Sequence, residues 1–370
     1  MIVGVPKEIK NNEFRVGLTP ASVRELVSHK HSVVVESNAG QGIGMDDGAY
    51  IAAGAKIAAT AEQVFAEAEM IVKVKEPQAL ERARLTDRHV LFTYLHLAPD
   101  PEQTHDLMAS GAMCIAYETV TSAAGGLPLL APMSEVAGRM AVQAGATALE
   151  KSKGGRGVLL GGVPGVEPAK IVILGGGVVG ANAALTAVGS GAEVVVIDRS
   201  LDVLRRLVAQ FGTRIKTVYS TTEAIEEHVV TADLVIGGVL IPGASAPKLV
   251  TRALLKRMRQ GAVIVDVAID QGGCFETSHP TTHDDPIYEV DGIIHYCVAN
   301  MPGGVPRTST FALNNATLPY TLALAGKGAR RALNEDPHLL NGLNVAYGKI
   351  TNKAVAAALN IPFTNPHNLI

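Results

Sequence analysis

Residues 171–198 read IVILGGGVVGANAALTAVGSGAEVVVID, and this stretch decides the fold. A run of β-branched residues leads into three spaced glycines, a helix of small residues follows, and a second apolar run ends at Asp198. Such glycines allow a tight turn, the approach of the backbone to a pyrophosphate and close packing of helix on sheet. The helix N-terminus then offers free N–H groups and a partial positive charge to the phosphates. We therefore expect Gly175, Gly177 and Gly180 to bind a dinucleotide.

Asp198 indicates which dinucleotide is bound. It follows Gly180 by 18 residues, where a carboxylate accepts hydrogen bonds from both hydroxyls of the adenosine ribose. Since that carboxylate would repel a 2′-phosphate, we expect NAD, although the adjacent Arg199 could accommodate the phosphate. The alternatives are an ordinary βαβ turn and a membrane span over residues 171–192. The glycines and polar residues of that stretch, and the lack of a basic flank, disfavour the span.

Composition predicts a globular α/β protein of two domains. A chain of 370 residues is too long for one simple core, and 47% hydrophobic with 18% charged residues is typical of soluble proteins. Without Trp, the core must be built from Val, Ile, Leu and Ala, as in parallel sheets. The net charge of −3 disfavours nucleic-acid binding. Three widely spaced cysteines and an opening strand without a signal-peptide core favour a reducing cytoplasm.

Two series of apolar runs alternate with helical patterns, which predicts two doubly wound, Rossmann-like α/β domains with parallel sheets. The predicted strands lie at 2–5, 33–36, 70–74, 89–93 and 112–117, and then at 171–174, 194–197, 233–237, 262–267 and 293–297. Helices are expected at 19–29, 60–68, 133–151 and 309–324, and short helices and loops from 329 onward. We expect a discontinuous substrate domain (1–130 plus 307–370), an NAD-binding domain (131–306), long helices bridging them and a cleft between them.

Three polar residues of the first half could carry chemistry. The guanidinium of Arg15, in a polar loop, could bind a substrate carboxylate, the alternative being a solvated surface arginine. Lys75 ends a strand, with Lys73 on the same face, and could hold a carboxylate or polarise a carbonyl; the alternative is a solvated edge lysine. His96 follows a strand at the edge where ligands bind in α/β sheets, so it is an acid–base candidate, and otherwise a buried structural histidine.

The second half offers further candidates. Asp266 and Asp270 interrupt and end a strand that should be buried, so Asp270 would face the nicotinamide, unless it only caps a turn. Asn300 follows another strand and could bond a carboxamide or ribose. Ser134 could donate to a phosphate or merely cap the interdomain helix.

The sequence does not predict a metal site. Cys274, His279, His283 and Cys297 contain an admissible His-x₃-His spacing, but there is no Cys-x-x-Cys pair, and Pro280 argues against a helix.

Several segments together resemble bacterial alanine dehydrogenase, in order and along the whole chain. They are KNNEFRV (10–16), KVKEP (73–77), LHLA (95–98), APMSEVAG (131–138), GGVPGVEP (161–168), DVAIDQGGCFE (266–276) and CVANMPG (297–303). The resemblance implies reversible NAD-dependent oxidative deamination of L-alanine to pyruvate and ammonium by a cytoplasmic homohexamer. It assigns Arg15 and Lys75 to the substrate, and His96 and Asp270 to acid–base catalysis. The full set of expected cofactor contacts is Ser134, Gly175, Gly177, Val178, Val179, Gly180, Asp198, Ser220, Val239, Leu240, Asn300 and Met301.

Two other functions remain possible on sequence grounds. The NAD(H)-binding component of proton-translocating transhydrogenase shares the expected fold and several of these segments, but it needs a partner that carries NADP. The joint presence of Arg15, Lys75 and His96 favours an enzyme with its own small substrate. A saccharopine-type dehydrogenase would need a pocket for a longer side chain.

Overall fold

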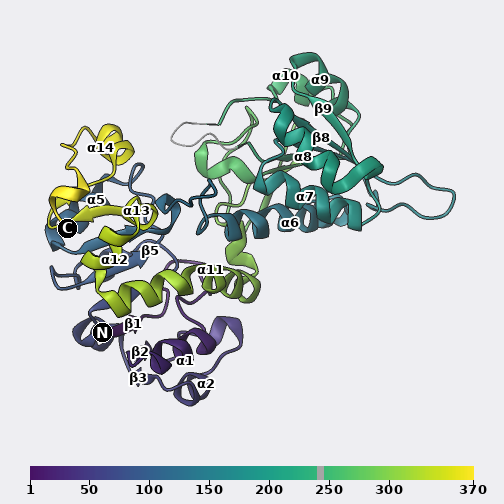
Figure 1. The fold of residues 1–370 in the computed structure, drawn as a ribbon. Coiled ribbons are helices and arrows are strands. Elements are labelled where there is room, and N and C mark those ends of the chain that lie inside the picture. The colour runs from purple at the N-terminus through teal and green to yellow at the C-terminus, as the bar shows by residue number, and fades with distance from the viewer. Residues whose placement is uncertain (240–245) are drawn as a thin grey trace. The chain divides into compact units, whose positions relative to one another are not determined.

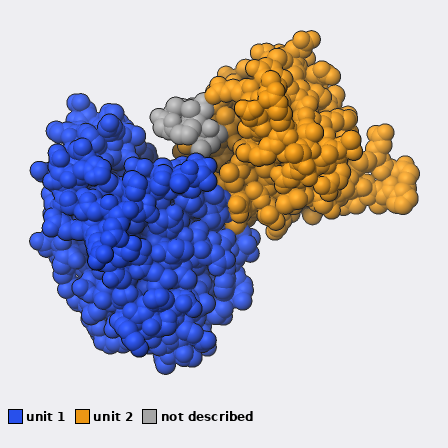
Figure 2. Space-filling view, viewed as in Figure 1, with its two compact units in different colours: residues 1–133, 305–370 blue, residues 134–304 orange. Residues whose placement is uncertain are grey.

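The computed structural model describes residues 1–239 and 246–370, which form two compact units. Unit 1 comprises residues 1–133 and 305–370, and unit 2 comprises residues 134–304 (Figure 2). Each unit is built around its own sheet, with helices between successive strands (Figure 1). Both sheets are mostly parallel, so the predicted α/β class is confirmed.

The sheet of unit 1 has the strand order β15-β14-β6-β5-β4-β1-β2-β3. Its parallel part consists of β1 (Ile2–Val5), β2 (Ser32–Glu36), β3 (Lys56–Ala58), β4 (Met70–Val72), β5 (Val90–Thr93) and β6 (Met113–Ala116). Beyond β6 the strands β14 (Leu343–Ala346) and β15 (Lys349–Ile350) are antiparallel. The prediction of short helices and loops after residue 329 missed these two strands.

Helix boundaries in unit 1 follow their capping residues. Helix α1 (Pro20–Ser28), expected over 19–29, begins after Thr19, whose side chain accepts the Ser22 N–H, and has proline in its first turn. The others are α2 (Asp47–Ala52), α3 (Ala61–Glu67), α4 (Ala79–Arg82), α5 (Pro101–Ser110), α11 (Pro306–Lys327), α12 (Ala329–Glu335), α13 (Pro337–Leu340) and α14 (Lys353–Leu359), with 3₁₀ turns η1 (Gln41–Ile43), η2 (Tyr117–Thr119) and η7 (Pro366–Asn368).

The long helix α11 has a buried polar face. Its buried polar residues are Ser309, Thr310, Asn314, Thr317 and Thr321. The amide of Asn314 donates to the carbonyl of Gly17 (3.1 Å) and accepts the N–H of Thr19 (2.8 Å), and Thr310 accepts the N–H of Val16 (3.3 Å). The backbone that follows Arg15 is therefore fixed to α11 by hydrogen bonds.

The sheet of unit 2 has the order β12-β13-β11-β10-β7-β8-β9. Its strands are β7 (Lys170–Leu174), β8 (Glu193–Asp198), β9 (Lys216–Tyr219), β10 (Leu234–Gly237), β11 (Val263–Asp266), β12 (Ile287–Val290) and β13 (Ile293–Tyr296), of which β12 alone is antiparallel to its neighbour among the described strands. Taken from β9, the parallel strands run 3-2-1-4-5-6, the order of dinucleotide-binding folds. The order reverses between β7 and β10, where such sheets bind their ligands.

The helices and turns of unit 2 are α6 (Ala131–Ala148), which begins in unit 1, α7 (Val178–Gly189), α8 (Leu201–Phe211), α9 (Thr222–Val230), α10 (Arg252–Leu255), η3 (Lys151–Lys153), η4 (Gly212–Arg214), η5 (Val267–Gln271) and η6 (Met301–Gly304). Ser200 caps α8, because its hydroxyl accepts the Val203 N–H.

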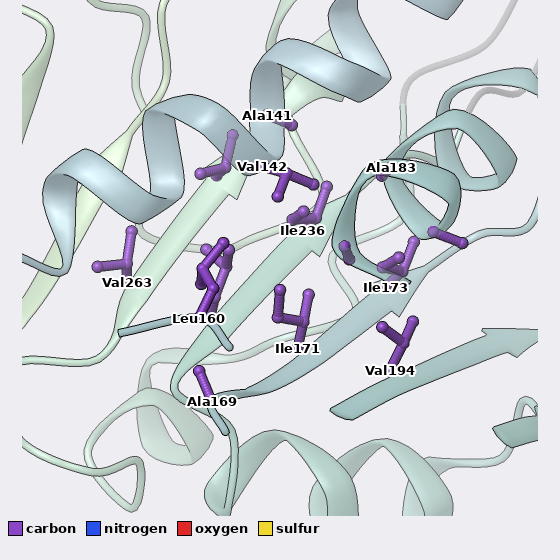
Figure 3. Close-up of a cluster of buried hydrophobic side chains, with 14 of the residues drawn as sticks. Ala141, Val142, Leu160, Ala169, Ile171, Ile173, Ala183, Val194, Ile236 and Val263 are labelled. Atoms are coloured by element: carbon purple, nitrogen blue, oxygen red, sulfur yellow. The ribbon is translucent and has the colours of Figure 1, made fainter. Parts of the chain in front are cut away.

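Both faces of this sheet are buried. Along β7, Ile171 and Ile173 belong to one apolar cluster, whereas Val172 and Leu174 belong to another on the opposite face. Figure 3 shows the first cluster, in which Ile171 and Ile173 lie among side chains of α6, α7 and neighbouring strands. Each fully buried side chain of this kind contributes roughly 1.5–3 kcal/mol of burial free energy. The core thus holds the carboxyl ends of the strands in fixed positions.

Candidate active site

Four parallel strands of unit 1 place polar side chains at one edge of the sheet. In the order β6-β5-β4-β1, the carboxyl ends of these neighbours meet on the same side. Glu118 follows β6, His96 follows β5 and Lys75 follows β4, while Arg15 lies in the loop after β1. The three unit 1 residues predicted from separate segments therefore come from loops at the carboxyl ends of neighbouring strands.

Arg15 is buried, with 2% of its surface exposed, so the alternative of a solvated surface arginine is wrong. Its Nε and Nη2 donate to the two carboxylate oxygens of Glu13, at 2.7 and 2.6 Å, and Nη1 lies 3.1 Å from the Met133 sulfur. Burial by itself would lower the pKa of Arg15, but the bond to Glu13 outweighs it and the pKa is raised. The guanidinium is therefore a permanent positive charge in a desolvated place.

Lys75 and Lys73 do not share a face in the way that the sequence predicted. Strand β4 ends at Val72, so the alternation of a strand does not extend to these lysines. The side chain of Lys75 is 14% exposed and its Nζ lies 3.4 Å from Glu76. Lys73 is fully buried and is bonded to Glu8 and Glu81, so a solvated-lysine interpretation fails for it. Only Lys75 of the two fits a substrate contact.

His96 has an unusual backbone and an accessible ring. Its φ is +49°, in the left-handed region, and its N–H donates to the Glu118 carboxylate at 2.7 Å. The ring is stacked on Tyr94 with centroids 5.8 Å apart, and its Nδ1 lies 3.9 Å from the same carboxylate. Because 45% of the side chain is exposed, the alternative of a buried structural histidine is wrong. His96 is accessible to a ligand and held by its neighbours.

Sequence reasoning did not select Glu118 or Tyr94. Both follow directly on apolar runs that were predicted as strands, which is the signal that led to His96 and could have led to them. The motif KNNEFRV contains Glu13 but does not indicate its role, which is to pair with Arg15 through a fully buried side chain.

The glycine-rich turn of unit 2 has the geometry that its spacing predicted. Gly175 has φ of +95°, and a Cβ on Gly180 would lie 1.8 Å from the Gly175 carbonyl oxygen, so a side chain is excluded there. Gly177 precedes α7 and a Cβ there would contact nothing within 4 Å, so its surroundings are open. Val178 is exposed and Val179 is half-buried at the start of the same helix. An anion can approach the N–H groups of the first turn of α7.

Asp198 ends β8 and holds this turn in place. One carboxylate oxygen accepts the N–H of Gly176 at 2.7 Å, and the other accepts the N–H of Ser200 at 2.7 Å. Its backbone carbonyl accepts the N–H of Ser220, which is half-buried. Each carboxylate oxygen has a further lone pair, so a ribose hydroxyl can still donate to Asp198.

Asp266 shapes the loop that carries Asp270. It is fully buried and accepts the N–H groups of Ala268 (3.2 Å) and Cys274 (2.9 Å). Burial raises the pKa of its carboxyl above the usual range, against the opposing effect of hydrogen bonds from the Ser278 side chain and from the N–H groups of Phe275 and Cys274. Asp270 lies in η5 between these anchors and is exposed. Asp266 is therefore a structural residue, and Asp270 is the accessible carboxylate.

The remaining predicted cofactor contacts lie at several positions in unit 2. Val239 follows β10 beside the glycine turn, where a Cβ on Gly175 would lie 3.0 Å from its side chain. Asn300 has φ of +64° and precedes the buried Met301 of η6. Ser134 is half-buried in the first turn of α6. Leu240 lies outside the described residues. His96 belongs to unit 1 and Asp270 to unit 2, so their joint action stays a prediction.

Two negative findings apply to the described part of the chain. Residues 1–239 and 246–370 contain no group of three or more His, Cys, Asp or Glu side chains arranged to hold a metal ion. In the same residues, no helix combines the length and the apolar character needed to cross a membrane.

Comparison with known proteins gives full-length similarity. Two family models match, "Alanine dehydrogenase/PNT, N-terminal domain" over residues 4–137 and "Alanine dehydrogenase/PNT, C-terminal domain" over residues 141–353. The chain is 58% identical to alanine dehydrogenase of Halomonas elongata over the whole of both chains, and 57% identical to that of Bacillus subtilis over 98% of this chain and 96% of the other. A solved L-alanine dehydrogenase superposes with a TM-score of 0.94 at 53% identity, covering 97% of this chain and 99% of that one. A transhydrogenase from Sinorhizobium meliloti superposes with a TM-score of 0.81 at 27% identity, covering 96% and 100%.

Proposed function

This chain belongs to the alanine dehydrogenase/PNT family, and on that premise we propose how its residues divide the reaction. The protein is an NAD-dependent oxidoreductase that converts L-alanine reversibly to pyruvate and ammonium. This function is supported by sequence identities of 58% and 57% to two alanine dehydrogenases, over nearly the full length of each chain. The roles of single residues below are proposals that rest on the geometry of each unit.

Arg15 and Lys75 bind the substrate in this proposal. Their two positive charges come from loops that follow neighbouring strands, and both side chains are largely removed from water. A carboxylate gains most from charged donors in such a place, and a fixed carboxylate orients the α-carbon. Arg15 would hold the carboxylate and Lys75 the carbonyl oxygen of pyruvate.

His96 and Asp270 carry the proton transfers. Hydride leaves the α-carbon more readily when the amine is neutral, so a base must take the ammonium proton, and water must then be activated to hydrolyse the imine. Both residues are exposed, as groups that exchange protons with a substrate must be. Glu118 and Tyr94 support the proposal because they hold the His96 ring and backbone in one orientation.

Unit 2 is proposed to bind NAD, and unit 1 to bind the substrate. The turn at Gly175–Gly180 and the start of α7 would hold the pyrophosphate, and Asp198 the adenosine ribose. Ser134, Ser220, Val239, Asn300 and Met301 complete the proposed contacts. When bound, NAD supplies the hydride acceptor, and the protein supplies orientation and proton transfer.

We also propose a cytoplasmic homohexamer. The resemblance to bacterial alanine dehydrogenase supports both points, and three free, buried cysteines are compatible with a reducing compartment. Sedimentation equilibrium of the purified chain would give the subunit number; a mass other than six chains would contradict it.

The function is tested by incubating the purified chain with NAD and single amino acids while reduced nicotinamide is followed. We expect turnover with L-alanine in the absence of any partner. The second candidate is an NAD(H)-binding component of a transhydrogenase, favoured by the superposition on the Sinorhizobium meliloti protein. That function predicts nucleotide binding without alanine oxidation, so the two outcomes are exclusive.

A further inference from the structure

A buried lysine between two glutamates lies next to the proposed substrate residue Lys75. The ammonium of Lys73 is fully buried and lies 3.0 Å from Glu8 and 2.6 Å from Glu81. Both glutamate side chains are only 2% exposed. Burial alone would lower the pKa of Lys73, but the two carboxylates outweigh it and the pKa is raised. The ammonium is therefore charged, and it is paired with two carboxylates of the protein.

Glu8 does more than pair with this lysine. Its second carboxylate oxygen accepts the backbone N–H of Val74 at 2.7 Å and, at 3.4 Å, that of Lys75. Glu81 differs, because its other oxygen accepts the N–H of Gln78 at the start of its own helix α4. The two glutamates share Lys73, but Glu8 is the one bonded to the backbone that carries Lys75.

The backbone here needs such an acceptor because strand β4 has already ended. The last residue of β4 is Val72, and the N–H of Lys73 still reaches the Phe92 carbonyl. One residue later, the buried N–H of Val74 is bonded to Glu8. A buried N–H without a partner is costly, so this bond selects one backbone path into Lys75. The hydroxyl of Thr93 holds the Lys75 carbonyl from the neighbouring strand at 2.9 Å.

We propose that Glu8 is a positioning residue that aims Lys75 at the substrate by holding the Val74–Lys75 backbone. This inference rests on the proposed role of Lys75 in substrate binding. Glu8 acts on the backbone through one carboxylate oxygen, which accepts the Val74 N–H, and its negative charge is paired with the ammonium of Lys73. A misplacement of Lys75 by about 1 Å would weaken substrate binding and turnover by up to roughly a hundredfold.

The test separates these two roles of Glu8. Glu8→Gln keeps an oxygen that can accept the Val74 N–H but loses the negative charge that faces Lys73. Glu8→Ala loses both the acceptor oxygen and the charge. We expect Glu8→Ala to raise the KM for pyruvate and alanine by about tenfold to a hundredfold, and Glu8→Gln to remain close to the unaltered protein. The dissociation constant of NADH should be the same in all of them. Glu81→Gln is the matched control, since it removes the other carboxylate from Lys73 and should leave KM unchanged.

Two results would overturn the inference: an unaltered KM in folded Glu8→Ala, or an equal rise in Glu8→Ala, Glu8→Gln and Glu81→Gln, which would assign the effect to the buried charges. If Glu8→Ala does not fold, Glu8→Asp replaces it, because the shorter side chain keeps the charge and withdraws the acceptor, and KM should again rise. The variant Lys75→Met distinguishes failure of the Glu8 inference from failure of the proposed role of Lys75. If Lys75→Met binds pyruvate normally, the role of Lys75 is wrong; if it does not, the Glu8 variants decide the inference alone.

Discussion

The carboxylate of Asp198 is predicted to have two separable roles, in cofactor choice and in holding the glycine-rich turn. Its two hydrogen bonds to the N–H groups of Gly176 and Ser200 are both 2.7 Å long. A hydrogen bond to a charged group contributes about 1.5–3 kcal/mol, which corresponds to roughly a tenfold to hundredfold change in an equilibrium constant. Asp198→Ala should therefore weaken NADH binding by at least about tenfold through the lost ribose contact. It should also lower the melting temperature, because the turn loses its anchor.

The comparison with Asp198→Asn separates the two roles. The amide oxygen can accept one of the two backbone N–H groups, and the charge that repels a 2′-phosphate is gone in both variants. Fluorescence titration with NADH and NADPH should show the preference for NADH narrowing by about tenfold or more in both, with the smaller loss of thermal stability in Asp198→Asn. An unchanged preference in both variants would refute the ribose assignment. A melting temperature unaltered in Asp198→Ala would refute the anchoring role.

Further predictions concern the substrate, the proton transfers and acid stability. Neutral replacement of Arg15 or Lys75 should abolish or greatly weaken pyruvate binding while NADH still binds in fluorescence titration; equal loss of both ligands would indicate misfolding instead. Removing His96 or Asp270 should lower turnover by roughly 10²–10⁴, and NADH binding should be retained in the His96 variant. Burial acts to raise the pKa of Glu76, but Lys75 and Lys10 outweigh burial and lower this pKa from 4.5 to about 2. The ionised Glu76 therefore stabilises the fold fully at pH values above its unfolded pKa. This stabilisation is lost as the pH falls toward 2. Glu76→Gln should lower the free energy of unfolding by as much as roughly 3 kcal/mol at neutral pH, an effect that urea titrations should find absent once the pH falls below about 2.

Local spacing was enough to predict how the glycine-rich turn and Asp198 lie relative to each other. The glycines of the turn and Asp198 lie within one βαβ unit, so their mutual placement follows from strand and helix lengths. The substrate side depends on contacts between segments distant in sequence. That His96 is held by Glu118 follows only when β5 and β6 are neighbours. Histidine adopts the left-handed backbone too rarely for residue type to predict it at position 96.

The sequence pattern failed at two places, the end of strand β4 and the C-terminal strand β14. The sequence pattern predicts a strand that runs to residue 74 and so puts Lys73 and Lys75 on one face, but β4 ends at Val72. Strand β14 is four residues long and contains Asn344, whose amide bonds the Gly342 carbonyl, so its sequence resembles a loop. Such a strand exists because the edge of β6 offers partners, which is a tertiary effect.

The discontinuity of unit 1 has a consequence for how the chain folds during synthesis. Strand β6 gains its outer neighbour only when β14 has been made, and all of unit 2 is translated in between. At 5–20 residues per second, the ribosome needs roughly ten to forty seconds for that interval. Throughout it, the outer edge of β6 presents unpaired N–H and C=O groups that another nascent chain could pair with. Slowing translation after residue 133 should therefore lower the soluble yield, and supplying residues 305–370 early, in a circular permutant, should raise it.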